Sequence, residues 1–169
     1  MPVRAQPFAA RAGPIRSLPQ PRLDSGFSLE RALCERRSTR EFRDAALTLD
    51  EVGQVLWAAQ DVTREDGLRT APSAGALYPL ELYLVAGNIH GLDAGVYHYR
   101  PQGHELNQIA DRDRRVALAA ASLGQECVAG AAVVLAFSAV ERRTLRKYGS
   151  RGHQYIRLEA GHAAQNAFL

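Results

Sequence analysis

The sequence predicts an α+β fold in which helices flank a central mixed or antiparallel sheet. Segments with helical and strand-like apolar patterns follow one another in the order α, α, β, β, β, α, β, α. Two of the strand-like segments surround a Pro-Gln-Gly turn at 101–103, the pattern of an antiparallel hairpin. The 169 residues, 46% of them hydrophobic, are enough for one domain with its own core.

Residues 1–26 predict a poorly ordered leader, and the domain is expected to occupy residues 27–169. The leader holds five prolines and shows no apolar periodicity. Residues 1–23 also carry four arginines and no acid, which leaves 17 basic against 18 acidic residues in the remainder of the chain. The net charge of +3 therefore belongs to the leader, and no nucleic-acid-binding surface is expected.

Two helices are expected at the start of the domain. The first runs from Ser28, as its N-cap, to about Arg37, with Leu29, Ala32 and Leu33 on one face. The second begins after Thr48, which forms a capping-box pattern with Glu51. A loop without periodicity follows, and long loops inside compact domains often carry function.

The remaining elements are predicted from their apolar patterns. Strands are expected over residues 80–86, 96–100, 104–109 and 131–137, with helices over residues 111–122 and 151–169. The nearly uniform apolar character of 131–137 predicts a central strand, and acidic residues fall in the first turn of the helix over 111–122. Residues 141–150 are expected to be a charged connector.

The last helix carries two further expectations. Glu159 lies on a face of small and apolar residues, which predicts a buried, hydrogen-bonded structural carboxylate. The sequence ends on Ala-Phe-Leu in the middle of a turn, with no glycine cap and no basic residue in that turn. We therefore expect the domain to be incomplete at its C-terminus.

Several classes of protein are disfavoured by motifs that the sequence lacks. No segment approaches the ~20 apolar residues of a membrane span, and arginines and prolines interrupt any secretory signal near the start, so a cytoplasmic location is expected. Cys34 and Cys127 have no CxxC spacing and are expected to be reduced and buried. The five histidines lack metal-ligand spacing, and no GxGxxG, P-loop or nucleophile elbow occurs.

The segment Arg36-Arg37-Ser38-Thr39-Arg40 is one candidate for chemistry. Its three guanidiniums and two hydroxyls could supply bidentate donors to a phosphate group. The alternative is a solvated helix end at which arginine complements the negative end of the helix dipole. Local sequence leaves both interpretations open.

A second candidate is the segment from Pro72 to Pro79, in which small residues lie between two prolines directly before a strand. Small side chains let backbone N–H groups approach a flat ligand or a phosphate, and the prolines restrict the conformation of the loop. A plain tight connection would have a similar sequence.

Taken together, these segments resemble the nitroreductase superfamily of flavin enzymes, and most closely its SagB-type branch, whose members oxidise azoline rings to azoles in peptide natural products. The resemblance covers about residues 29–169 and rests on ERRSTREF, APSAGALYPLELYLV, GVYHY, LGQECV and KYGSRGHQYIRLEAGHAAQN. It implies a nitroreductase-like fold, here without its last strand or strands, and FMN bound non-covalently at a homodimer interface.

The resemblance also implies roles for individual residues. The positions that match Arg36, Arg37, Ser38 and Arg40 hold the flavin phosphate and ribityl chain. Those that match Pro72, Ser73, Ala74 and Gly75 approach the isoalloxazine from the other subunit, and Gln125 falls near an amide that faces the polar edge of the ring.

Lys147 and Tyr148 match the Lys-Tyr pair of the SagB-type enzymes, and Lys147 is the only lysine of the sequence. Loss of hydride from a ring carbon requires a group that takes or relays a proton, which a lysine or a tyrosine can do. The alternative for the pair is a solvated connector without a catalytic role.

The resemblance therefore implies an FMN-dependent SagB-type dehydrogenase that acts on azoline rings in a small molecule or modified peptide, with a cyclodehydratase complex as a partner. Two alternatives remain open at this point. One is a general NAD(P)H-dependent nitro- or quinone-reductase, and the other is a non-catalytic remnant that binds a peptide or a partner protein.

Overall fold

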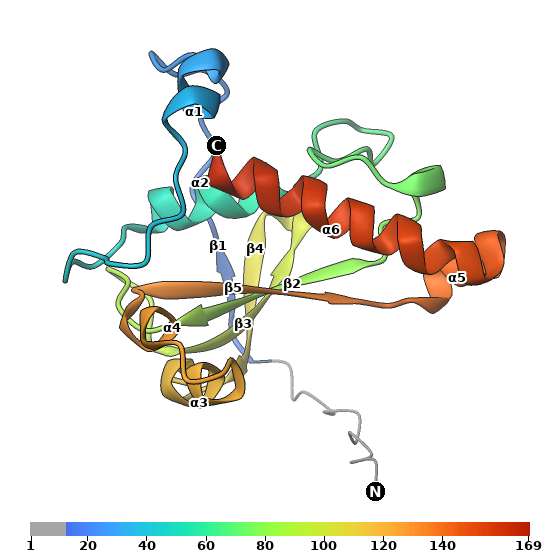
Figure 1. Cartoon of the computed structure of the whole chain (residues 1–169). Coiled ribbons are helices and arrows are strands. Elements are labelled where there is room, and N and C mark those ends of the chain that lie inside the picture. The colour runs from blue at the N-terminus through green and yellow to red at the C-terminus, as the bar shows by residue number, and fades with distance from the viewer. Residues whose placement is uncertain (1–12) are drawn as a thin grey trace, which may run out of the picture.

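The computed structural model describes residues 13–169, and an antiparallel five-stranded sheet forms its centre (Figure 1). The strands are β1 (Ile15–Ser17), β2 (Leu80–Ala86), β3 (Gly95–Arg100), β4 (Glu105–Ala110) and β5 (Val133–Ala139). They lie in the order β1-β4-β3-β2-β5, and every neighbouring pair is antiparallel. The predicted α+β class is confirmed.

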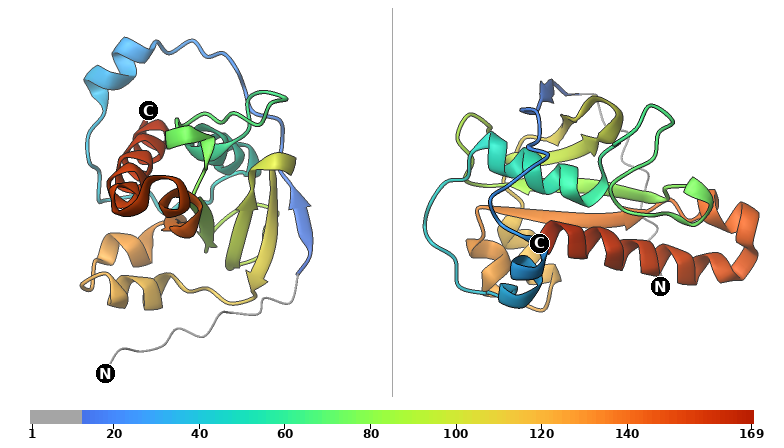
Figure 2. Two further views of the ribbon diagram at one scale, coloured as in Figure 1. Left: turned by 90° about the vertical axis from the view of Figure 1, so that its right-hand side faces the viewer. Right: turned by 90° about the horizontal axis from the view of Figure 1, so that it is seen from above.

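Six α-helices accompany the sheet in the described part of the chain. They are α1 (Leu29–Glu35), α2 (Leu49–Gln60), α3 (Arg115–Ala121), α4 (Glu126–Gly130), α5 (Arg142–Tyr148) and α6 (Gly152–Phe168), with short 3₁₀ turns η1 (Ala74–Ala76), η2 (Pro101–Gly103) and η3 (Gly149–Arg151). Helices α2 and α6 pack against each other beside the sheet (Figures 1 and 2). No helix within residues 13–169 is both long and apolar enough to cross a membrane.

The main core lies between α2 and the sheet. Leu56 of α2, Leu84 of β2 and Leu106 of β4 are completely buried, and Tyr99 of β3 is 1% exposed. Full burial of one such side chain stabilises the fold by about 1.5–3 kcal/mol relative to leaving it exposed. The start of α2 is fixed by the predicted capping box, because Thr48 and Glu51 each accept a hydrogen bond from the backbone N–H of the other.

Residues 13–26 differ from the poorly ordered leader that composition predicted. Strand β1 pairs with β4, and Leu18, which follows it, is buried in the main core. Prolines are compatible with this position because β1 lies at an edge of the sheet, where Pro14 and Pro19 flank the strand. Residues 1–12 of the predicted leader lie outside the described residues.

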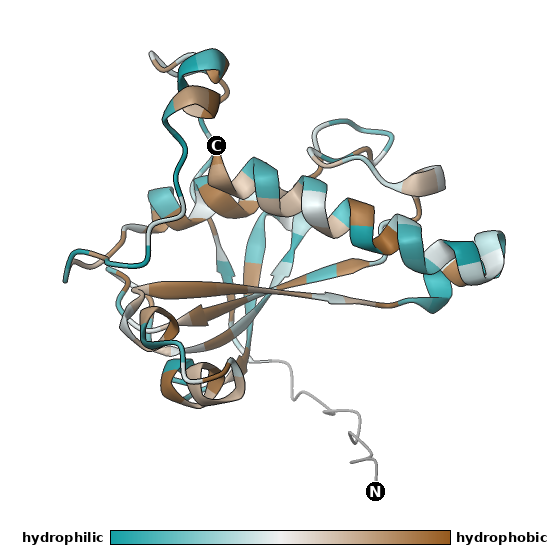
Figure 3. Cartoon of the chain, viewed as in Figure 1, coloured by the Kyte–Doolittle hydropathy of each residue, from teal (hydrophilic) through white to brown (hydrophobic). Residues whose placement is uncertain are grey.

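Strand β5 lies at an edge of the sheet, which contradicts its predicted central position. Within residues 13–169 it pairs with β2 only. Figure 3 shows that β5 is hydrophobic over most of its length. Its apolar side chains are half-buried, and Val133, Leu135 and Phe137 pack against the main core. The apolar sequence of β5 therefore indicates that its side chains pack on the core. It does not indicate whether the strand lies at the centre or at an edge of the sheet.

The other differences concern helices and cysteines. The predicted connector at 141–150 contains α5, and the helix expected from residue 111 begins only at Arg115, whose backbone N–H is accepted by Asp113 at 2.9 Å. The acidic residues therefore precede that helix, and α4 was not predicted.

Helix α1 has no buried residue, so its apolar face is exposed. Both cysteines are free, and the prediction that they are buried is wrong, because Cys34 is exposed and Cys127 is only half-buried.

Candidate active site

The loop from Pro72 to Pro79 forms a tight, left-handed turn in front of β2. Gly75, Ala76 and Tyr78 have φ angles of +66°, +53° and +43°. The backbone N–H of Tyr78 donates to Ser73 Oγ at 3.0 Å, which closes the turn on its own side chain. Gly75 is suited to its conformation because a side chain at positive φ is strained.

Lys147 and Tyr148 converge on this turn from α5. A methyl group placed on Gly75 would lie 2.8 Å from Lys147 Nζ and 2.8 Å from the hydroxyl oxygen of Tyr148. The absent side chain of Gly75 is therefore what allows the ammonium and the hydroxyl to reach the loop. The structure brings together two of the predicted groups of site residues that lie about 70 positions apart in the sequence.

The aromatic surroundings of α5 fix the Tyr148 ring. The rings of Tyr148 and Tyr155 meet edge to face, with centroids 4.9 Å apart, and Lys147 Nζ lies 5.4 Å from the centroid of the Tyr148 ring. Arg151 donates a hydrogen bond to the Tyr155 hydroxyl at 2.9 Å. The Lys147 side chain is exposed, whereas Tyr148 is half-buried.

The arginine cluster after α1 is also exposed. Arg37 Nη1 donates to the carbonyl oxygens of Cys34 at 2.8 Å and Arg36 at 2.7 Å. Arg37 therefore interacts with the C-terminal end of α1, as the alternative interpretation of this segment predicted. Within residues 13–169 the side chains of Arg36, Ser38 and Arg40 form no hydrogen bond or ion pair. These three remain available for a ligand.

One chain alone does not bring the two groups of predicted flavin contacts together. The segment after α1 and η1 lie at opposite ends of the domain, separated by the length of α6 (Figures 1 and 2). Gln125, the N-cap residue of α4, is exposed, and α4 lies at the same end as the segment after α1. The predicted cofactor residues therefore form two separate sets in a single chain.

Glu159 lies behind the loop, on α6, and is 3% exposed. Its burial agrees with the prediction, although its Oε1 atom has no hydrogen-bond partner within the described structure. Burial raises the pKa of Glu159, and the nearby polar groups of Ser73, Arg69 and Gln60 oppose that rise only in part. Glu159 consequently favours its protonated form more than an exposed glutamate does.

Replacing Glu159 with Gln is expected to raise the melting temperature at pH 7 by a few degrees. The raised pKa means that the native state holds its proton more tightly than the unfolded state does. The wild-type chain therefore loses stability as the pH rises from about 4.5 through the native pKa, and the variant does not. Thermal unfolding of both chains from pH 4 to pH 8 measures the difference, with exposed Glu126→Gln as control; parallel curves would contradict it.

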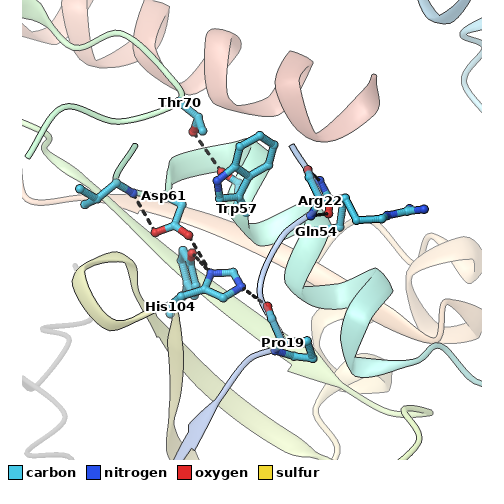
Figure 4. A network of polar contacts seen from close by, with 9 residues as sticks. Pro19, Arg22, Gln54, Trp57, Asp61, Thr70 and His104 are labelled. Carbon is cyan, nitrogen blue, oxygen red and sulfur yellow. Dashed lines mark hydrogen bonds and ion pairs between the residues drawn. The ribbon is translucent and has the colours of Figure 1, made fainter. Parts of the chain in front are cut away.

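A buried polar network next to the main core was not predicted from the sequence (Figure 4). His104 Nδ1 lies 2.7 Å from a carboxylate oxygen of Asp61 and 2.8 Å from the hydroxyl of Tyr99. His104 Nε2 lies 3.0 Å from the carbonyl oxygen of Pro19. Both nitrogens of a 9%-exposed ring are thus engaged, which ties β1 and its flanking segment to the hairpin and to the end of α2.

No spacing in the sequence points to this network, because Asp61 precedes His104 by 43 positions and Pro19 precedes it by 85. A second link fixes the same segment to α2. The backbone N–H of Arg22 donates to Gln54 Oε1 at 2.8 Å, and Gln54 Nε2 donates back to the Arg22 carbonyl at 3.1 Å (Figure 4). Residues 13–169 contain no group of three or more histidine, cysteine, aspartate or glutamate side chains placed to hold a metal ion.

The class of protein follows from the fold together with a family model. The model described as "Nitroreductase family" matches residues 33–169. The chain therefore belongs to the nitroreductase family, whose members are generally flavin-dependent oxidoreductases. The nitroreductase-like fold predicted for it is confirmed.

Two curated relatives illustrate the range of this family. The chain is 45% identical over 143 residues to MJ1384 of Methanocaldococcus jannaschii, a protein provisionally named a nitroreductase, and the match covers 85% of this chain and 72% of that protein. It is 33% identical over 106 residues to the microcin B17-processing protein McbC of Escherichia coli, covering 60% of this chain and 39% of McbC.

The similar solved structures also include both a nitroreductase-type protein and a microcin-processing complex. A nitroreductase-type protein from Anabaena variabilis superposes with a TM-score of 0.78 at 29% identity, over 92% of this chain, and this chain spans about a third (33%) of that one. The E. coli microcin synthetase McbBCD complex with truncated pro-MccB17 bound matches with a TM-score of 0.64 at 26% identity, over 90% of this chain and 62% of the matched chain.

Proposed function

We propose that this chain is an FMN-dependent dehydrogenase of the SagB type that oxidises azoline rings to azoles in a peptide natural product. The observation that carries the proposal is the convergence of Lys147 and Tyr148 on Gly75 in the predicted flavin loop. Ring oxidation removes a hydride and a proton, and the pair would take or relay the proton beside the loop. The likeness to McbC and to the McbBCD complex supports a peptide substrate.

The residues of this chain suit the cofactor that the proposal requires. Arg36, Ser38 and Arg40 offer exposed, unpaired donors for the phosphate and ribityl chain, since arginine binds phosphate through two parallel hydrogen bonds. Ser73, Ala74 and Gly75 present small side chains and backbone to a flat ring. When bound, FMN would supply the hydride acceptor.

We further propose that the active form is a homodimer. The donors after α1 and the loop that contains η1 lie at opposite ends of one chain, so they can share one cofactor only if two chains contribute to each site. A twofold axis would then create two equivalent sites. By analogy with the McbBCD complex, the dimer would work with a cyclodehydratase that forms the azoline.

The proposal is tested by the visible spectrum of the purified chain after incubation with FMN and removal of free cofactor. We expect retained flavin bands and, in sedimentation, the mass of a dimer. The double variant Arg36→Ala/Arg40→Ala should lose the bands, whereas Arg43→Ala, an exposed arginine of the same segment, should keep them. A wild-type chain that stays colourless would contradict FMN binding by residues 1–169 and favour the non-catalytic binding protein.

A second candidate function is reduction of nitro or quinone compounds with NAD(P)H. It is favoured by the 45% identity to MJ1384, the protein provisionally named a nitroreductase. This reaction needs the same flavin site but assigns no role to Lys147 and Tyr148. Substitution of that pair therefore separates the two candidates.

A further inference from the structure

A cavity of about 380 Å³ is lined by Tyr78 and by Arg143, which lies about one helical turn before Lys147 on α5. None of the residues assigned above to the flavin lines it. Its charged and polar lining includes Gln60, Arg69, Glu81, His98, Arg100 and Arg143. The lining thus contains three guanidiniums and one carboxylate, so its net charge is positive.

The one carboxylate of the lining is already engaged. Glu81 accepts from His98 at 2.6 Å and from Arg143 at 2.5 Å, and these contacts lower its pKa. Arg143 also donates to the backbone carbonyl of Tyr78 at 3.0 Å, so it is held between the loop and β2. Arg100 pairs outside the lining with Glu105, at 3.3 Å. Glu81 is consequently a fixed part of the wall.

Arg69 and Gln60 form the inner part of the lining. Gln60 is 1% exposed, and its side chain, like Arg69, lies near the buried carboxylate of Glu159 and opposes the rise of the Glu159 pKa. Arg69 Nη1 donates to Gln60 Oε1 at 3.0 Å, and its guanidinium lies 4.6 Å from the centroid of the Tyr78 ring. A guanidinium held in this way suits a ligand that brings acceptor oxygens, because such oxygens accept charge-assisted hydrogen bonds from it.

We propose that this cavity binds a carboxylate group, and that the group belongs to the peptide substrate. The second part rests on the proposed function. Arg143 and Lys147 are four residues apart on α5 and therefore lie on the same face of the helix, about one turn from each other. A carboxylate held at Arg143 and Arg69 places the neighbouring atoms of the same molecule toward Lys147. The cavity is thus an anchoring site beside the reacting groups.

The test is calorimetric titration of the chain, without FMN, with three capped tripeptides. N-acetyl-Gly-Gly-Gly carries a terminal carboxylate, its amide carries none, and N-acetyl-Gly-Glu-Gly-amide carries the charge on a side chain. We expect at least tenfold tighter binding of one or both acids than of the neutral amide. The two acids distinguish a terminal from a side-chain carboxylate.

Variants on α5 and at the cavity lining provide the controls. Arg143→Gln is expected to weaken binding of the acid at least tenfold, to the level of the amide, whereas Arg146→Gln, an exposed arginine on the same helix and outside the lining, leaves it within twofold. Gln102→Glu, at an exposed position of the lining, adds a negative charge and should weaken the acid several-fold without disturbing Arg143.

Equal binding of acid and amide would overturn the carboxylate site, and so would unchanged acid binding in Arg143→Gln. If circular dichroism shows that Arg143→Gln does not fold, Gln102→Glu decides, and unchanged acid binding there overturns the proposal. Because no FMN is present, the result is independent of the flavin test. If the chain binds the acid but retains no flavin, the carboxylate site is supported and the proposed FMN-dependent function is contradicted.

Discussion

Replacement of Lys147 with Met, or of Tyr148 with Phe, is expected to lower the rate of azoline oxidation by about 10²- to 10⁴-fold, the usual contribution of a positioned proton-transfer group. Both side chains reach the loop at Gly75, where the reacting ring would lie. The measurement is the conversion of an azoline peptide to the azole by the flavin-loaded protein. Mass spectrometry follows it as the loss of two hydrogens from the peptide.

The same variants distinguish the two candidate functions. An azoline-oxidation rate that falls at least a hundredfold further than the rate of nitroarene reduction supports the SagB-type assignment. Rates that fall together, or an azoline rate within threefold of wild type, would contradict a proton-transfer role for the pair. Arg146→Met is the matched control, because Arg146 is an exposed neighbour on the same helix.

Replacement of Asp61 with Ala is expected to lower the free energy of unfolding by about 3 kcal/mol. The substitution leaves His104 Nδ1 without its buried carboxylate partner, and loss of one partner of a buried polar pair is strongly destabilising. It also removes the acceptor for the backbone N–H of Val62, at 2.7 Å. In a domain of this size the melting temperature should fall by roughly 6–12 °C.

Urea and thermal unfolding measure this effect, with Asp111→Ala at an exposed carboxylate as the control. The network fixes the segment after β1 through the Pro19 carbonyl, so hydrogen exchange at the backbone of Leu18 should accelerate in the Asp61 variant. A loss below 1 kcal/mol would show that the network contributes little to the stability of the fold.

The elements that the sequence predicted well are those with local signals. Strand β2 has the predicted bounds, and α2 begins at the predicted capping box, because alternation and capping depend on residues within a few positions of each other. Helix α5 was missed because it is charged and short. What holds it is contact with α6, where the missing side chain of Gly152 lets Leu145 approach.

The site divides in the same way. Motif resemblance supplied the candidate flavin residues, but the approach of Lys147 and Tyr148 to Gly75 depends on a glycine at positive φ and on the packing of α5, which no local pattern encodes. The cavity around Arg69 and Arg143 joins residues of five separate segments. Each arginine has the sequence context of an ordinary surface charge, so nothing singled these residues out.

The two edges of the sheet differ in how readily they accept another strand. Strand β1 offers three residues flanked by prolines, a short edge of the kind that limits further pairing. Strand β5 offers seven residues, six of them apolar and none a proline, and one row of its backbone N–H and C=O groups has no strand beside it within residues 13–169. Self-association through backbone pairing, on concentration or heating, is therefore directed to one side of the molecule. Solubility is best engineered at Ser138, the exposed position of that strand.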